Sequence, residues 1–472
     1  MQGRAIIFVP MTPPTLARRG IRHATATLVA LAVAGLPVRA EPTRPLPVPT
    51  TRDSLSAAER ALVRAVDAKN AEALALLERL VNINSGTMNF AGVKEVGAVL
   101  RAEFDALGFV TRWVDGAPFK RAGHLVAEHK GPGPKLLLIG HLDTVFEPIS
   151  PFQKYEKLSD TSARGPGVTD MKGGDVIMLH ALKALKATGA LDRMNVVVVM
   201  TGDEENSGEP LELARRPLVE AAKGAYAALG FEDGSGDPRT AVTSRRSSSG
   251  WTLRSTGKPA HSSQVFTADV GAGAIYESAR VLQGFRERLS AERYLTFNPG
   301  VALGGTTVTH EPPEGRGTAF GKDNVVAETM IVSGDIRAIS PEQLANAKRT
   351  MQEIVAAHLP QTSSEIVFDD GYPPMAPTPG NAKLLALHDS TSRDLGYGPV
   401  VAVDPAKAGA ADVSFTAGHV SMAIDALGLA GRDGHTVNET ADIGMLAPLT
   451  KRAAVLLYRL SRRAPPNATP AS

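Results

Sequence analysis

Three short apolar runs in this chain each have the length of one buried strand. They occupy residues 136–139, 196–200 and 226–231, and a helical pattern at 174–187 lies between the first two. Strands that alternate with helices predict an α/β domain with a mixed central sheet flanked by helices. Open sheets of this kind build their sites at the carboxyl ends of the strands. The residues that follow each run are therefore the candidate site.

Acidic and histidine residues gather at these positions in four clusters. In chain order they are His141 and Asp143; Asp170; Asp203, Glu204 and Glu205; and Glu232 and Asp233. Taken singly, an acid or histidine at the end of a strand is usually a structural or turn residue. Taken together, the four clusters fit a carboxylate-bridged site for two metal ions. Two cations about 3.5–4 Å apart need a shared carboxylate, and each needs further His or carboxylate ligands.

The composition narrows the classes of site that are possible. The chain has no Cys, which excludes disulfides, thiolate zinc sites, iron–sulfur clusters and thiol catalysis. It has 51 Lys and Arg against 49 Asp and Glu, and this net charge of +2 lacks the excess of basic residues that is typical of nucleic-acid-binding proteins. A length of 472 residues indicates two or three domains.

The first 40 residues have the layout of a secretory signal. They contain no Asp or Glu, and Arg18, Arg19 and Arg22 precede an apolar run at residues 24–36. A small-x-small pattern ends at Ala40, where we expect cleavage. The apolar run is too short for stable membrane insertion, so we expect an exported protein, periplasmic or secreted. The alternative interpretation is a disordered basic extension.

Four segments give the chain a resemblance to a known family. They are HLDTV at 141–145, GVTDMKGG at 167–174, TGDEENSG at 201–208 and FED at 231–233. The set resembles the co-catalytic dizinc exopeptidases, a family of glutamate carboxypeptidases, aminoacylases, di- and tripeptidases and succinyl-diaminopimelate desuccinylases. The resemblance spans about residues 70–460 and is nearest to the glutamate carboxypeptidase branch.

The resemblance implies a ligand set for two divalent metal ions. His141, Asp170 and Glu232 would hold one ion, and Asp170, Glu205 and His435 would hold the other. Asp170 would bridge the two ions and precede a cis peptide bond. We expect zinc, although His and carboxylate ligands also suit cobalt or manganese.

The resemblance also implies roles beyond the metal ligands. Glu204 would be the general base, and Asp143 would orient the ring of His141. In the family the inserted domain is a lid, a four-stranded antiparallel sheet with two helices that often mediates dimers. His261, Asn324 and Arg337 match lid positions that contact substrate, His261 from the partner subunit of a homodimer.

The domain boundaries follow from a change in the predicted secondary-structure pattern near residue 245. The pattern after it is strand–helix–strand–strand–helix–strand, typical of a small α+β domain. We divide the chain into a signal peptide (1–40), a linker (41–53), a first catalytic segment (54–245), the inserted lid (246–360), a second catalytic segment (361–463) and a disordered tail (464–472).

The implied activity is that of an exported, metal-dependent exopeptidase of the carboxypeptidase type. A water between the two metal ions, deprotonated by Glu204, would cleave an amide bond beside a free carboxylate in a small peptide or N-acyl amino acid. One position departs from the branch: Tyr372 stands where glutamate carboxypeptidases carry an Arg for the substrate carboxylate. A phenol cannot form the bidentate ion pair of an Arg. The alternatives are an aminoacylase or dipeptidase of the same family and, more remotely, an inactive binding protein.

Two further features have no predicted role in the site. Arg245 and Arg246 are interpreted as a solvated junction between the domains. His124 lies in a loop-like stretch and is not expected to bind metal.

Overall fold

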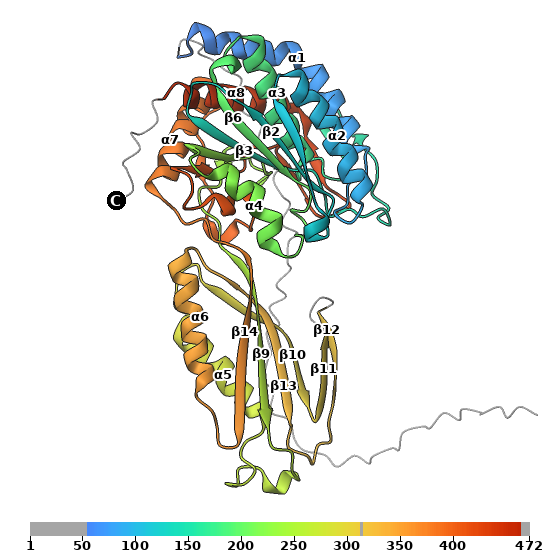
Figure 1. The fold of residues 1–472 in the computed structure, drawn as a ribbon, viewed down its shortest axis with the longest axis vertical. Coiled ribbons are helices and arrows are strands. Elements are labelled where there is room, and N and C mark those ends of the chain that lie inside the picture. Colours follow the sequence, from blue (N-terminus) through green and yellow to red (C-terminus); the bar gives the residue numbers. More distant parts are fainter. Residues whose placement is uncertain (1–53, 312–314, 464–472) are drawn as a thin grey trace, which may run out of the picture. The chain divides into compact units, whose positions relative to one another are not determined.

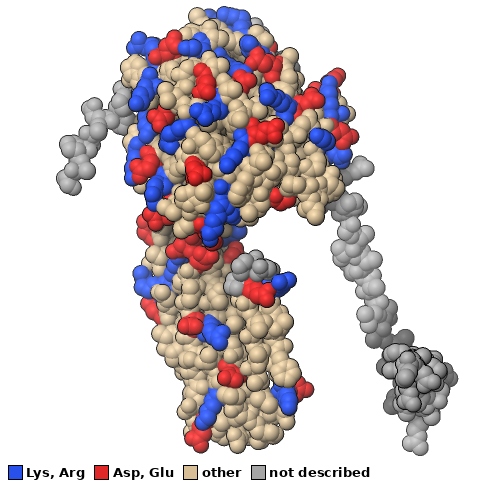
Figure 2. All heavy atoms as spheres, turned by 45° about the vertical axis from the view of Figure 1, so that its right-hand side comes forward, with Lys and Arg blue, Asp and Glu red and all other residues tan. Residues whose placement is uncertain are grey.

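The computed structural model describes residues 54–311 and 315–463. The predicted signal peptide, linker and C-terminal tail all lie outside these residues. Among the helices that are described, none combines the length and the apolar character needed to cross a bilayer. On the face drawn in Figure 2, basic and acidic side chains lie side by side, with no broad patch of one sign.

The central sheet has six strands in the order β1-β2-β6-β3-β7-β16. Their bounds are β1 Val110–Asp115, β2 Gly123–His129, β3 Lys135–His141, β6 Asn195–Thr201, β7 Ala227–Gly230 and β16 Ala423–Ile424. β6, β3, β7 and β16 pair in parallel, whereas β1 and β2 pair antiparallel with their neighbours. The three predicted strands are thus the middle of a mixed sheet, which confirms the predicted fold class.

Both faces of the sheet are covered, so the inner strands are apolar on both sides. Leu136 and Leu138 of β3 face a core that includes side chains of α1, α2, α3 and α8 (Figure 1). Leu137 and Ile139 face the opposite core, to which α4 contributes. The bounds of the helices are α1 Ala57–Val81, α2 Phe90–Ala106, α3 Lys172–Ala187, α4 Leu211–Ala222, α7 Pro379–Asp394 and α8 Leu446–Ser461.

Short elements complete the catalytic part. A four-stranded sheet in the order β17-β18-β5-β4 and a two-stranded pair of β15 and β8 lie outside the central sheet. Their bounds are β4 Glu156–Lys157, β5 Ser162–Arg164, β8 Thr240–Ala241, β15 Val401–Ala402, β17 Gly431–Arg432 and β18 Thr440–Asp442. Among the described residues of this part, the 3-10 helices are η1 Ala117–Phe119, η2 Leu191–Arg193, η5 Pro405–Lys407, η6 Asp412–Thr416 and η7 Ile443–Met445, and the lid contains η3 Ser262–Gln264. Because β18 pairs with β5, the β17–β18 hairpin lies beside the segment that leads to Asp170.

The lid is a separate antiparallel sheet in the order β10-β13-β9-β14, with helices α5 and α6 (Figure 1). The bounds are β9 Ser248–Gly257, α5 Ala274–Leu289, β10 Thr296–Gly305, β13 Thr329–Arg337, α6 Pro341–Ala356 and β14 Thr362–Tyr372. Trp251 packs edge-on against Phe285 in its core. The predicted four strands and two helices are present. A further hairpin, β11 Thr307–Glu311 with β12 Arg316–Phe320, was not predicted.

The last lid strand shows where the predicted boundary fails. The sequence predicts that the inserted domain ends at residue 360, but β14 pairs with β9 along most of its length. Its residues therefore belong to the lid sheet, and the chain leaves the lid only at about Tyr372. The boundary was misplaced because a strand on a solvated sheet face has no long apolar run to mark it.

Candidate active site

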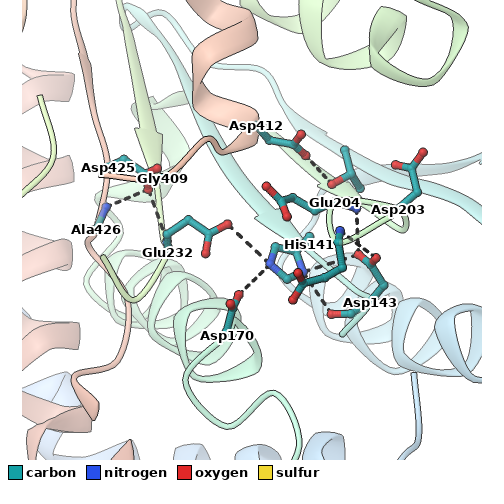
Figure 3. Close-up of polar contacts among 12 residues, drawn as sticks. His141, Asp143, Asp170, Asp203, Glu204, Glu232, Gly409, Asp412, Asp425 and Ala426 are labelled. Carbon is teal, nitrogen blue, oxygen red and sulfur yellow. Dashed lines mark hydrogen bonds and ion pairs between the residues drawn. The ribbon is translucent and has the colours of Figure 1, made fainter. Parts of the chain in front are cut away.

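Asp170, Glu232 and His141 meet at the carboxyl edge of the central sheet (Figure 3). His141 is the last residue of β3, Asp170 precedes α3, and Glu232 follows β7. The Nε2 atom of His141 lies 3.0 Å from Asp170 Oδ1 and 3.5 Å from Glu232 Oε1. The parallel pairing of β3 with β7 brings these side chains together, as the positions of their strand ends predict.

A second group lies on the other side of Asp170. The Nε2 atom of His435 lies 2.9 Å from Asp170 Oδ2 and 3.3 Å from Glu205 Oε2. In each group the candidate ligand atoms all lie within 4.8 Å of one another. Asp170 offers one oxygen to each group, which is the geometry of a bridging carboxylate.

The hydrogen bonds around these groups fit two divalent cations. The Nδ1 atom of His141 lies 3.1 Å from the carbonyl oxygen of Asp143, which can accept the Nδ1 proton. That tautomer leaves the Nε2 lone pair facing two carboxylates, an arrangement that a cation between them stabilises. Glu205 Oε1 is buried without a hydrogen-bond partner, and such an orphaned acceptor is also suited to a cation.

The electrostatics of the site favour added positive charge. Burial raises the pKa of Glu232, and the nearby charge of Asp170 raises it further. Hydrogen bonds to Asp170 and Glu205 raise the pKa of His435 to about 11. Burial opposes ionisation of Asp170, but hydrogen bonds from both histidines outweigh it and hold the pKa of Asp170 well below its usual range. Bound cations would replace these protons and keep the acids ionised.

The segment that carries Asp170 is held in place by Glu439. The carboxylate of Glu439 accepts hydrogen bonds from the backbone N–H groups of Gly167, Thr169 and Asp170 at 3.0, 2.8 and 3.2 Å. The peptide bond between Asp170 and Met171 is cis, as the resemblance implies. Sequence reasoning missed Glu439, although it lies only four residues after His435 in the same hairpin.

Asp143 holds the turn that carries Glu204 and Glu205. Its Oδ1 and Oδ2 atoms accept the backbone N–H groups of Glu204 and Glu205 at 3.1 and 3.2 Å. The hydroxyl of Thr87 donates to the same carboxylate at 2.6 Å. The side chain of Glu205 belongs to the second group, whereas that of Glu204 belongs to neither. Glu205 can therefore bind a metal ion while the adjacent Glu204 serves another function.

His124 lies beneath the same turn and corrects one expectation. It is a buried residue of β2, not of a loop. Its Nδ1 atom accepts the backbone N–H of Gly202 at 3.1 Å, so its Nε2 carries the proton and donates to the carbonyl of Ala214 at 2.7 Å. Burial lowers the pKa of His124, in keeping with a neutral ring.

Arg245 corrects a second expectation, because it is buried rather than solvated. Its Nε and Nη2 atoms donate to Asp425 Oδ2 at 3.0 and 2.7 Å, and Nη1 donates to the carbonyl of Gly409 at 2.7 Å. Asp425 Oδ1 accepts the backbone N–H of Glu232 at 3.3 Å (Figure 3). The ion pair thus helps to hold the backbone of Glu232, a candidate metal ligand. The neighbouring Arg246 stays partly exposed.

The three predicted lid residues lie at two different places in the lid. His261 and Asn324 are exposed and close together, since His261 pairs with Val325 in an isolated bridge. Arg337 ends β13 and donates to Asp335 at 3.0 Å. The nine-residue strand β13 separates it from His261 and Asn324 by about 25–30 Å. Within the described residues, none of the three hydrogen-bonds to the candidate metal ligands.

Comparison with known proteins identifies a matching family and several similar proteins. Residues 137–459 match the model of peptidase family M20/M25/M40. Carboxypeptidase G2 of Pseudomonas sp. (strain RS-16) is 26% identical over 388 residues, which cover 81% of this chain and 88% of that protein. Aminoacylase-1 of Mus musculus is 30% identical over 223 residues, 44% of this chain and 51% of that protein.

Solved structures share the fold. Aminopeptidase PepT of Bacillus cereus ATCC 10987 has a TM-score of 0.66 at 18% identity and covers 83% of this chain and 99% of its own. A dinuclear metal-binding peptidase of the M20 family from Bacillus subtilis has a TM-score of 0.58 at 15% identity and covers 84% and 99%. These proteins therefore share the fold of this chain over most of its length.

The bridging geometry predicts the effect of removing one ligand. His435→Ala should bind about one divalent ion per chain instead of two and should lose turnover, because only one group remains complete. Metal content by elemental analysis beside activity measures both effects. His419→Ala, which removes an exposed loop histidine, is the matched control and should keep both ions. Two tightly bound ions and full activity in His435→Ala would overturn the ligand assignment.

Proposed function

This chain belongs to peptidase family M20/M25/M40 and is a dinuclear metallopeptidase, and from this premise we propose that it is an exported exopeptidase of the carboxypeptidase type. Its substrate would be a small peptide or N-acyl amino acid, cleaved at an amide bond beside a free carboxylate. The observation that carries the proposal is the sharing of Asp170 between two ligand groups, with Glu204 next to them but part of neither.

In this proposal each candidate residue has one task. His141, Asp170 and Glu232 hold one cation, and Asp170, Glu205 and His435 hold the other. We propose zinc, with cobalt and manganese suited to the same His and carboxylate ligands. In such a site two divalent cations lower the pKa of a water molecule and polarise the scissile carbonyl group.

Glu204 acts as the general base. It accepts a proton as water attacks the carbonyl carbon and delivers that proton to the leaving amine. Burial raises the pKa of Glu204, and the nearby charges of Asp412 and Glu205 raise it further. A carboxylate with a raised pKa is suited to this task, because it accepts a proton more readily than an ordinary carboxylate. Asp143 orients His141 through the Nδ1 hydrogen bond.

The lid residues support a homodimer joined through the lid. A single chain holds His261 and Asn324 at one end of β13 and Arg337 at the other. Both ends could serve one substrate if His261 and Asn324 come from the partner subunit. His261 would then stabilise the oxyanion and Arg337 the substrate carboxylate. Export is proposed from the signal-like pattern that ends at Ala40.

Aminoacylase activity is the second candidate, favoured by the partial likeness to aminoacylase-1 of Mus musculus. A dipeptidase would differ from both by requiring a free N-terminal amine. An inactive binding protein would retain the ligands but release no product, and the presence of Glu204 beside them argues against it.

A substrate panel separates these candidates. We expect metal-dependent release of a C-terminal amino acid from N-blocked dipeptides, and no release from the same compounds with an amidated C-terminus. Chelation should abolish release, and added zinc should restore it. Cleavage of N-acyl amino acids alone would indicate an aminoacylase, and cleavage of unblocked dipeptides alone a dipeptidase. Absence of release from every compound would contradict the proposed substrate class.

The two adjacent glutamates should respond differently to substitution. Glu204→Ala should keep both metal ions and the fold but lose about 10²–10⁴-fold in kcat with little change in KM, since it removes proton transfer. Glu205→Ala should lose a metal ion. Elemental analysis and steady-state kinetics on both variants test the assignment. A loss of metal in Glu204→Ala with two ions kept in Glu205→Ala would show that the roles are exchanged.

Mixing two inactive variants tests the dimer. If His261 acts across the interface, His261→Ala and Glu204→Ala chains should regain partial activity once their subunits exchange. One site of each heterodimer would then have both residues intact. Mixing Glu204→Ala with Glu205→Ala is the control and should give no recovery, because both defects fall in the same site. No recovery despite demonstrated exchange would place His261 within its own subunit's site or outside the mechanism.

A further inference from the structure

Tyr372 connects the lid to the turn that carries the proposed base. It is the last residue of β14, the strand by which the chain leaves the lid sheet. Its hydroxyl oxygen lies 3.0 Å from the backbone carbonyl oxygen of Glu204. The side chain that replaces the expected substrate-binding Arg therefore contacts the peptide group of Glu204.

Arg215 determines the direction of this hydrogen bond. Its Nη2 atom lies 2.6 Å from the Tyr372 hydroxyl oxygen. A guanidinium can only donate, so the phenol oxygen accepts from Arg215 and keeps its own proton for another partner. The carbonyl oxygen of Glu204 can only accept. The Tyr372 hydroxyl therefore donates to the carbonyl oxygen of Glu204. Because it is hydrogen-bonded to both Arg215 and Glu204, its hydroxyl is not available to bind a substrate carboxylate.

The phenol is fixed because Arg215 is fixed. Arg215 is 1% exposed and forms ion pairs with Asp203 Oδ1 at 2.6 Å and Asp412 Oδ1 at 2.7 Å. Both acids are buried as well. A buried charge cannot leave such partners without a large desolvation penalty, so the cluster has one favourable arrangement. The Tyr372 ring also packs edge-on against Phe415, with ring centroids 5.0 Å apart.

The other side of the same peptide group is held by Asp143. The carbonyl of Glu204 and the N–H of Glu205 belong to one planar peptide unit. Tyr372 binds its oxygen at 3.0 Å, and Asp143 Oδ2 binds its nitrogen at 3.2 Å. The plane of this peptide sets the directions in which the side chains of Glu204 and Glu205 leave the backbone.

We propose that Tyr372 is a positioning residue for the general base, and that it and Asp143 clamp the Glu204–Glu205 peptide from its two sides. The clamp keeps the Glu204 carboxylate directed at the reacting water while Glu205 stays with its metal ion. This inference rests on the proposed role of Glu204, and it assigns to Tyr372 a task within the protein instead of contact with substrate.

The test removes one oxygen atom. Tyr372→Phe keeps the ring against Phe415 but leaves the carbonyl of Glu204 without its donor. We expect kcat on the best substrate of the wild-type enzyme to fall about 10–100-fold, since small misplacements of a catalytic group have effects of this size. KM should change less than about twofold, both metal ions should remain bound, and thermal unfolding should show a folded protein.

Tyr397→Phe is the matched control. Tyr397 is also a buried tyrosine, 6% exposed, but it belongs to a different core cluster together with Leu395 and Val455. The same loss of a hydroxyl there should leave kcat unchanged. A wild-type kcat in Tyr372→Phe, a rise in KM with kcat unchanged, or a loss of metal would each overturn the proposal, because a positioning residue acts on kcat alone.

A crystal structure of each metal-loaded variant gives a readout that needs no substrate. In Tyr372→Phe the Glu204 carboxylate should be displaced or occupy several orientations, whereas in Tyr397→Phe it should stay in place. An unmoved Glu204 in Tyr372→Phe would overturn the clamp. Failure of the proposed substrate class would show separately, in the panel run with the wild-type enzyme.

Discussion

The concentration of acidic side chains at one edge of the central sheet is the constraint to which the rest of the site responds. Asp143, Asp170, Glu204, Glu205 and Glu232 lie together in surroundings where burial disfavours their ionised forms. Carboxylates this close need positive charge or hydrogen-bond donors to remain ionised. His141 and His435 supply part of it, and two divalent cations would supply the rest. The site is therefore a place where folding and metal binding favour one another.

The structure meets this constraint mainly through backbone N–H groups. Asp143, Glu439 and Asp425 each direct a carboxylate at the amides of a segment that carries a candidate ligand or the proposed base. Such bonds orient a neighbouring side chain without adding a second negative group to the metal-facing surface. Asp425 is in turn neutralised by Arg245, as Asp203 and Asp412 are by Arg215. The two buried arginines thus keep the supporting acids from raising the charge of the site itself.

Local sequence was sufficient for the elements and motifs but not for these partners. The strands that end at His141, Thr201 and Gly230 are marked by apolar runs, and the acids after them by their strand-end position. Arg245 and Asp425 are separated by 180 residues in the chain, and nothing local distinguishes either from a surface charge. His124 was misjudged for the same reason. The lid boundary failed because β14 alternates between partly buried and exposed residues, a weaker signal than a continuous apolar run.

The buried cluster around Arg215 also bears on how a substrate carboxylate can be held. An Arg at position 372 would bring a second guanidinium to within hydrogen-bond distance of the first, where the present phenol oxygen accepts from Arg215 at 2.6 Å. Two guanidinium groups cannot hydrogen-bond to each other, and like charges in a buried place repel strongly. An Arg at position 372 that took the place of the phenol would therefore be unfavourable beside Arg215. Under the proposed function a substrate carboxylate would then be bound by a different group. Arg337 is the candidate, because its side chain is 34% exposed and its ion-pair partner among the described residues, Asp335, is exposed as well.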